Sequence, residues 1–123
     1  MAENKKPQID NFSIVYYQYY YPSPRNFGEI IWSNPRTGLV WRNYIGGKYV
    51  IYKITSQSKG YTSFVPLTDE ELQETSLRKN SNVDMGSPQQ VDKRNIISLV
   101  SIAPRSLIKR ILIKESVYNS NYR

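Results

Sequence analysis

The chain has 123 residues, a length that fits one ordinary domain with one hydrophobic core. It carries 17 Lys and Arg against 10 Asp and Glu, a net charge of +7, and contains neither His nor Cys. The missing residue types exclude thiol nucleophiles, disulfides, Cys/His zinc sites and every catalytic triad that uses imidazole. No convergent catalytic set is visible among the remaining residues, so we expect no enzyme, no metal site and no cofactor.

The N-terminal residues are polar and lack the apolar stretch of a secretory signal. No apolar run approaches the roughly 20 residues that are needed to cross a bilayer. The sequence therefore predicts a protein that is cytoplasmic or lies within an assembled particle, with no membrane partner. Residues 1–11 are expected to be a flexible arm and 119–123 a frayed end, on either side of a single domain at 12–118.

Strand signals dominate the first half of the chain. Residues 12–21 (FSIVYYQYYY) are β-branched and aromatic, which predicts a strand that ends before Pro22-Ser-Pro24. Strands at 29–33, 39–45 and 48–54 predict an antiparallel meander, with turns at Asn34–Gly38 and at Gly46-Gly47. Because both faces of residues 48–54 are apolar, the sheet is either covered on one side and used on the other or curved into a small barrel.

The middle of the chain predicts one more strand, at Tyr61–Leu67, and one acidic helix. Thr68 and Glu71 have the spacing of a capping box, which predicts a helix over 69–79. Its acidic residues suit the positive end of a helix and need no metal ion there. Residues 80–92 (NSNVDMGSPQQVD) have loop composition, so we expect a mobile loop.

The C-terminal part predicts a buried strand at 95–102 and then a helix that opens after Pro104 and continues to residue 118. Leu107, Ile108, Ile111 and Leu112 form an apolar stripe at helical spacing, opposite basic residues. Leu107–Ile113 also fits the period of a strand. The predicted fold class is α+β: a small antiparallel sheet or partly closed small barrel of the β-meander type, one short acidic helix, and a C-terminal basic amphipathic helix.

The net charge is segregated along the chain. Residues 1–67 carry +5, residues 68–92 carry −4 and residues 93–123 carry +6. A basic surface attracts anionic partners, either nucleic acid or an acidic protein face, although it also keeps a small protein soluble. Gly46-Gly47-Lys48 lacks the spacing of a phosphate-binding loop, but its lysine stands at a turn. The candidate nucleic-acid contacts are Arg25, Arg36, Arg42, Lys48, Arg105, Lys109, Arg110 and Lys114.

The tyrosine run is the least ordinary feature in a chain that contains 11 Tyr. Phenol rings suit surfaces that are apolar at one end and wet at the other. Such a strand can form a protein interface or a stacking platform for bases, although a plain strand with one buried face shows the same pattern. The candidate partner contacts are Tyr16, Tyr17, Tyr19, Tyr20 and Tyr21, with Leu107 and Ile111 of the C-terminal stripe.

These features predict a non-enzymatic structural or adaptor subunit of a larger assembly, such as a phage particle or another nucleoprotein complex. Its expected partners are other protein subunits with acidic surfaces. The alternative is a single-stranded nucleic-acid-binding module, in which Tyr17, Tyr19 or Tyr52 stacks on bases while basic residues neutralise phosphates.

Overall fold

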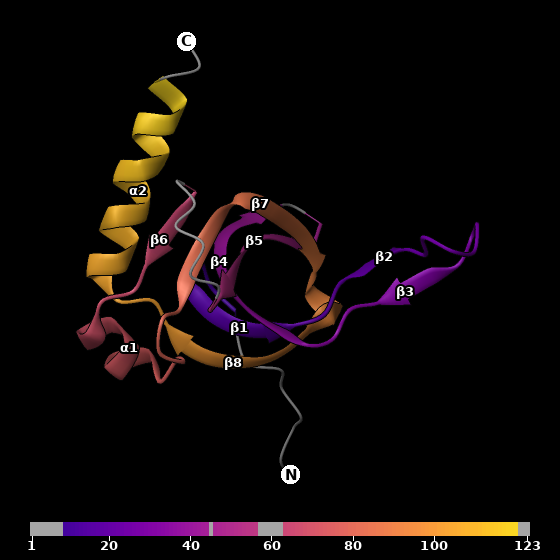
Figure 1. The fold of residues 1–123 in the computed structure, drawn as a ribbon, viewed down its shortest axis with the longest axis horizontal. Helices are drawn as coiled ribbons and strands as arrows, with labels where there is room; N and C mark the ends of the chain where they lie inside the picture. Colours follow the sequence, from indigo (N-terminus) through magenta and orange to yellow (C-terminus); the bar gives the residue numbers. More distant parts are fainter. Residues whose placement is uncertain (1–8, 45, 57–62, 121–123) are drawn as a thin grey trace.

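A computed structural model describes residues 9–44, 46–56 and 63–120, which form a six-stranded antiparallel sheet, a projecting hairpin and two helices (Figure 1). The sheet has the strand order β6-β7-β5-β4-β1-β8. Its strands are β1 (Ser13–Tyr17), β4 (Arg36–Tyr44), β5 (Lys48–Thr55), β6 (Phe64–Pro66), β7 (Asn82–Asp92) and β8 (Ile96–Ile102). The hairpin consists of β2 (Tyr20–Pro22) and β3 (Ile30–Trp32). The two α-helices are α1 (Asp69–Thr75) and α2 (Arg105–Ser120), and a short 3-10 turn, η1 (Lys93–Asn95), precedes β8.

The sheet curls strongly, as the ring of strands in Figure 1 shows. Within the part of the chain that the structure describes, its edge strands β6 and β8 do not pair with each other. The expected α+β class with an antiparallel sheet is confirmed, as is the helix that begins after Pro104. The partly closed barrel stays a prediction.

The central strands of the sheet are covered on both faces, because their alternate residues enter two separate apolar clusters. Ile14 and Leu39 belong to the cluster that also contains Leu107 and Ile111 of α2. Their chain neighbours, including Val15, belong to the second cluster. Since β1 is buried on both faces, its position in the middle of the curl is fixed by packing on either side.

The segment at 80–92, which we expected to be a mobile loop, is largely strand β7, and it lies between β5 and β6. Its Asn, Ser, Gly and Pro residues gave it the composition of a loop. Ile51 of β5 is opposite Gln89, whereas Lys53 is already opposite Asp84, so residues 85–88 bulge out of the pairing. Pro88 lies in this bulge, where its missing N–H costs no bond of the ladder.

Gly38 lies inside β4 and not in the turn expected at Asn34–Gly38. The preceding strand β3 pairs with β2, so only β4 and β5 of the expected meander pair with each other, across the Gly46-Gly47 turn. A Cβ atom on Gly38 would overlap the side chains of Tyr17 and Ile51. The glycine is therefore required by the close approach of a tyrosine ring and not by turn geometry.

Other boundaries also differ from the expectation. The strand expected at 12–21 breaks after β1, and the acidic helix ends at Thr75 because Ser76 adopts a left-handed conformation with φ of 58°. Strand β8 is an edge strand whose central residues are exposed, so the expected burial is wrong. Residues 1–8 of the arm expected at 1–11, and 121–123 of the end expected at 119–123, lie outside the described residues. Ile9 is buried in the core, and α2 continues to Ser120.

Two carboxylates fix α2 against the rest of the molecule. Glu71, which is 2% exposed, accepts hydrogen bonds from the Thr68 N–H at the start of α1 and from Ser106 and Arg110 of α2. Further along the helix, Glu115 accepts from the Trp41 Nε1–H of β4 at 2.7 Å. The helix is thereby held by charge-assisted hydrogen bonds in its first half and again at Glu115.

Helix α2 also covers the β6 edge of the sheet. Arg110 donates to the Pro66 carbonyl at 2.6 Å, and Lys114 Nζ donates to the Phe64 carbonyl at 3.0 Å. Both carbonyl groups belong to β6, and pairing them with cations removes acceptors to which another strand could add. Basic residues of α2 thus protect an edge of the sheet.

Replacing Glu71 tests whether this buried carboxylate supports the fold. Glu71→Ala removes the capping-box partner of Thr68 and leaves the Arg110 guanidinium without its counter-ion, so we expect the free energy of unfolding to fall by about 3 kcal/mol. Urea denaturation followed by circular dichroism measures the change. Glu70→Ala on the exposed face of the same helix is the matched control, with an expected change below about 0.5 kcal/mol. Equal losses for the two variants would contradict the assignment.

Candidate functional site

The hairpin arm, residues 20–32, extends away from the six-stranded sheet (Figure 1). Tyr20 pairs with Trp32 and Pro22 with Ile30 along its two short strands. The connecting loop is also ordered by its own hydrogen bonds, because the Ser23 hydroxyl accepts from the N–H groups of the residues two and three positions later. The arm is thus a structured projection rather than a loose loop.

The base of the arm is fixed to the body of the molecule by Ser33, which is buried. Its hydroxyl accepts from the Tyr19 N–H at 3.1 Å, and its own N–H donates to the Tyr19 carbonyl at 2.7 Å. The neighbouring Gln18 N–H donates to the Asn95 carbonyl at 3.0 Å. These bonds join both strands of the arm to each other and to the turn before β8.

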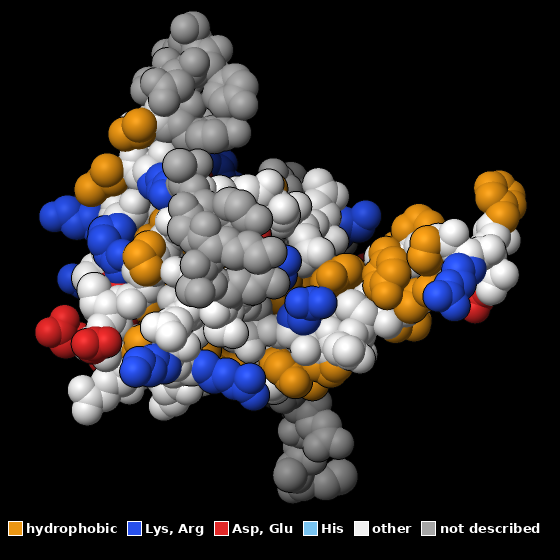
Figure 2. All heavy atoms as spheres, viewed as in Figure 1, with side chains coloured by type: hydrophobic (Ala, Val, Ile, Leu, Met, Phe, Trp, Pro, Cys, Tyr) orange, Lys and Arg blue, Asp and Glu red, His pale blue; other side chains and the backbone are white. Residues whose placement is uncertain are grey.

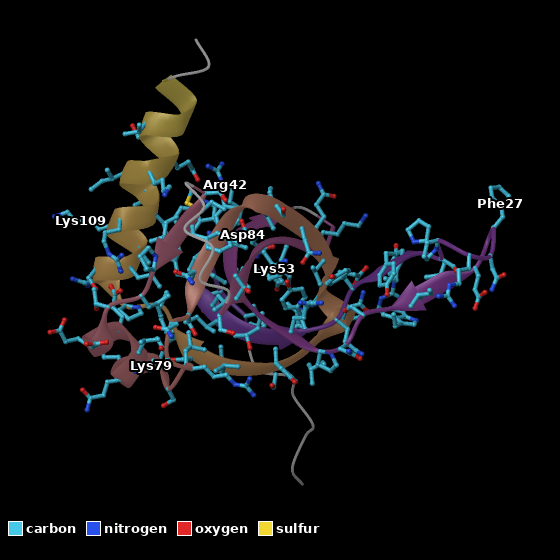
Figure 3. The ribbon with its side chains drawn as sticks, in the orientation of Figure 1. Phe27, Arg42, Lys53, Lys79, Asp84 and Lys109 are labelled. Carbon is cyan, nitrogen blue, oxygen red and sulfur yellow. The ribbon has the colours of Figure 1, made fainter. Side chains whose placement is uncertain are left out.

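Apolar side chains gather along the arm, as Figure 2 shows, together with one basic and one acidic side chain near its end. Phe27 points away from the body at its tip and is fully exposed (Figure 3). Ile30 is 59% exposed, and the other large exposed side chains are Tyr20, Tyr21 and Trp32. Apolar side chains collected on a projection are typical of surfaces that contact another molecule.

A groove of about 790 Å³ opens where the arm meets the sheet, and we call it the hairpin groove. Tyr20 and Trp32 of the arm meet there edge to face, with their ring centroids 5.5 Å apart. Lys48 enters from the start of β5. The full lining consists of Tyr19, Tyr20, Trp32, Lys48, Gln90, Val91, Asp92, Arg94 and Asn95.

Charge in the hairpin groove comes from two cations and one carboxylate. Arg94 Nε donates to Asp92 Oδ1 at 3.3 Å, and the Arg94 backbone N–H donates to the same oxygen at 2.9 Å. The backbone hydrogen bond, then the guanidinium, and finally Lys48 lower the pKa of Asp92 below its ordinary value. Since the carboxylate is ionised at neutral pH, the groove carries one net positive charge.

The candidate nucleic-acid contacts are dispersed over the molecule. Arg110 and Lys114 bind β6, and Arg42 forms an ion pair with Glu115 at 3.1 Å, so these three are engaged within the protein. Of the candidates, only Lys48 lines the hairpin groove. The remaining four are exposed on three different elements, with two of them on α2: Arg25, Arg36, Arg105 and Lys109. Arg94 was not among the candidates from the sequence. Its one local signal is Asp92, which stands two positions earlier and caps the turn η1.

The candidate partner contacts divide between core and surface. Tyr17, Leu107 and Ile111 are fully buried, so we remove these three from the candidate surface. The other four candidates lie toward or on the arm and keep exposed area: Tyr16, Tyr19, Tyr20 and Tyr21. The rings of Tyr17, Tyr19 and Tyr21 follow one another at 6.3 and 6.1 Å, as period two predicts. A tyrosine ladder thus runs from the core onto the arm.

Comparisons with known proteins give no family for this chain, since no family model and no curated protein matches it. Along the described helices, none combines the length and the apolar character that a membrane span requires. No group of three or more acidic side chains that could hold a metal ion occurs among the residues with described positions. Function is therefore inferred from the geometry of the arm and its groove.

The buried phenol of Tyr17 predicts a pH dependence of stability. It donates to Gln89 Oε1 at 2.7 Å, and burial, reinforced by Tyr19, raises its pKa above the ordinary value of 10.0. The phenol ionises at lower pH in the unfolded chain than in the folded protein. Its contribution to the free energy of unfolding is therefore complete below pH 10 and is lost as the pH rises toward the folded-state pKa. Tyr17→Phe should cost about 1 kcal/mol at neutral pH and then lose less stability than the wild type above pH 10.

Urea titrations at pH 7.5, 9.5 and 10.5 measure this difference. Tyr20→Phe on the exposed arm removes a phenol without changing any buried hydrogen bond, so its stability should parallel that of the wild type. A Tyr17→Phe variant that declined as steeply as the wild type would show that the phenol ionises equally easily in both states.

Proposed function

We propose that this protein is a non-enzymatic structural or adaptor subunit of a larger assembly, such as a phage particle or another nucleoprotein complex. The observation that carries the proposal is the hairpin arm, which holds its large apolar side chains clear of the chain's own core. A cytoplasmic or particle location and the partial closure of the curled sheet into a barrel belong to the same proposal.

The form of the arm favours docking on another protein. Its turn is closed by internal hydrogen bonds, and its base is tied to the body through Ser33, so little conformational freedom is lost on binding. Exposed aromatic side chains outside the hairpin groove, such as Tyr21 and Phe27, are also residue types that are enriched in protein interfaces. The arm itself carries one Arg and one Glu, so it is Lys48 at its base that favours a partner with an acidic surface.

A second candidate function is binding of single-stranded nucleic acid. Tyr17 and Tyr52 are buried, so the stacking residues that the sequence favoured are mostly inaccessible. The observation that supports this function is instead the hairpin groove, where exposed aromatic rings and two cations share one opening. It concerns a different surface from the outer face of the arm.

Two isoleucines of nearly equal exposure give a matched test of docking by the arm. Ile30 on β3 is 59% exposed and Ile113 on α2 is 56% exposed. We expect Ile30→Ser to weaken binding to a stoichiometric protein partner by about tenfold or more, whereas Ile113→Ser changes it less than about twofold. Tagged variants purified from the native source and measured by mass photometry give the comparison.

Nuclease treatment of the same samples separates the two candidate functions. A protein complex held by the arm survives the treatment, whereas a complex bridged by nucleic acid falls apart. A strictly monomeric protein that co-purifies with nothing, or equal effects of Ile30→Ser and Ile113→Ser, would refute docking by the arm.

A further inference from the structure

We propose that the hairpin groove binds a short unpaired stretch of nucleic acid, with a base stacked at Tyr20 and Trp32 and its phosphates held by Arg94 and Lys48. This inference gives the second candidate function a defined site. It does not depend on protein docking by the outer face of the arm, so the two can fail separately.

The aromatic pair provides the surface for a base. Tyr20 and Trp32 are cross-strand partners, 58% and 54% exposed, and both line the groove. Their rings are inclined at 69° to each other, so they form a corner in which a flat ring can lie against one aromatic face and the edge of the other. Every nucleobase offers such a flat face, but only when it is unpaired and unstacked.

The cations reach the same opening from two distant parts of the sequence. Lys48 begins β5 and Arg94 lies in the turn η1. A backbone hydrogen bond joins their chain neighbours, because the Lys93 N–H donates to the Gly47 carbonyl at 2.7 Å. The Arg94 side chain is 85% exposed. It uses Nε and Nη2 for Asp92, and since a guanidinium has five N–H donors, others remain for a phosphate oxygen.

The size and the chemistry of the groove favour nucleic acid over an acidic peptide. A volume of about 790 Å³ lies within the range of sites that enclose a ligand of nucleotide size. An acidic peptide would satisfy the two cations but would leave the corner between Tyr20 and Trp32 without a flat partner. A nucleotide carries both a flat ring and a negative charge, and the groove is lined by both aromatic rings and cations.

The negative charge of Asp92 lowers the affinity of the groove for any anion. Removing this charge should therefore strengthen binding of nucleic acid. Its side chain is 30% exposed at the groove and stays ionised at neutral pH. Asp92→Asn removes the negative charge but keeps an oxygen that can accept from the Arg94 N–H. We expect this variant to bind a labelled 15-nucleotide oligothymidylate about threefold more tightly than the wild type at low salt.

Charge-neutralising variants of the intact chain test the phosphate contacts. Arg94→Gln and Lys48→Gln should each weaken binding of the oligothymidylate about fivefold, measured by fluorescence anisotropy, and should each reduce its salt slope by about one. Lys79→Gln is the matched control, because Lys79 is exposed beyond α1, away from the arm (Figure 3), and the variant has the same net charge. It should weaken binding less than about twofold.

Stacking has a spectroscopic signature in this chain. Trp32 is exposed and Trp41, the second of its two tryptophans, is only 4% exposed, so a base that stacks in the groove quenches Trp32 fluorescence. Trp32→Ala should weaken binding about tenfold and abolish the quenching. Phe27→Ala removes an aromatic ring from the tip of the same arm, outside the groove, and should change neither quantity.

Several outcomes would overturn the inference. They are no binding of the oligothymidylate at low salt, equal binding of a duplex of the same length, and binding that Arg94→Gln and Lys79→Gln weaken equally. Displacement of the oligonucleotide by polyglutamate, together with unchanged Trp32 fluorescence on oligonucleotide binding, would identify the groove as a site for acidic protein. Retained oligonucleotide binding by Ile30→Ser would separate this site from protein docking.

Discussion

The buried carboxylate of Glu71 holds three elements of the fold in one arrangement. It ties the first turn of α1 to α2 through Arg110, and Arg110 in turn binds the Pro66 carbonyl of β6. A charge that is 2% exposed is tolerated only with its partners in place, so these positions depend on one another. Once α2 is held there, Leu107 reaches the face of the sheet.

The arm occupies a particular place in the topology. Strands β1 and β4 pair directly in the sheet, and the chain between them runs out and back as β2 and β3. The arm is therefore an enlarged hairpin connection, whose base is set by a rigid central pair of strands. Because loop length costs little free energy, such a projection can be added without weakening the sheet. The groove arises at the point where this connection leaves the sheet.

Local signals in the sequence predicted the elements that depend on neighbouring residues. The capping box at Thr68, the Gly46-Gly47 turn and the C-terminal helix after Pro104 are all present. Strand β7 was missed because its loop-like residues are accommodated by pairing with distant strands. Gly38 was misplaced for the same reason, since its role depends on the Tyr17 ring. The groove has no local signal, because its lining comes from the arm, the start of β5, the end of β7 and the turn η1.

Strand order also sets a sequence of events during synthesis of the chain. Strand β1 has β4 on one side and β8 on the other. The first neighbour, β4, emerges from the ribosome soon after β1, but the second, at Ile96–Ile102, follows the end of β4 by more than 50 residues. At about 5–20 residues per second, this delay lasts on the order of 2–10 s. For that time one side of β1 has no partner, and a nascent chain on the same message can occupy it in place of β8.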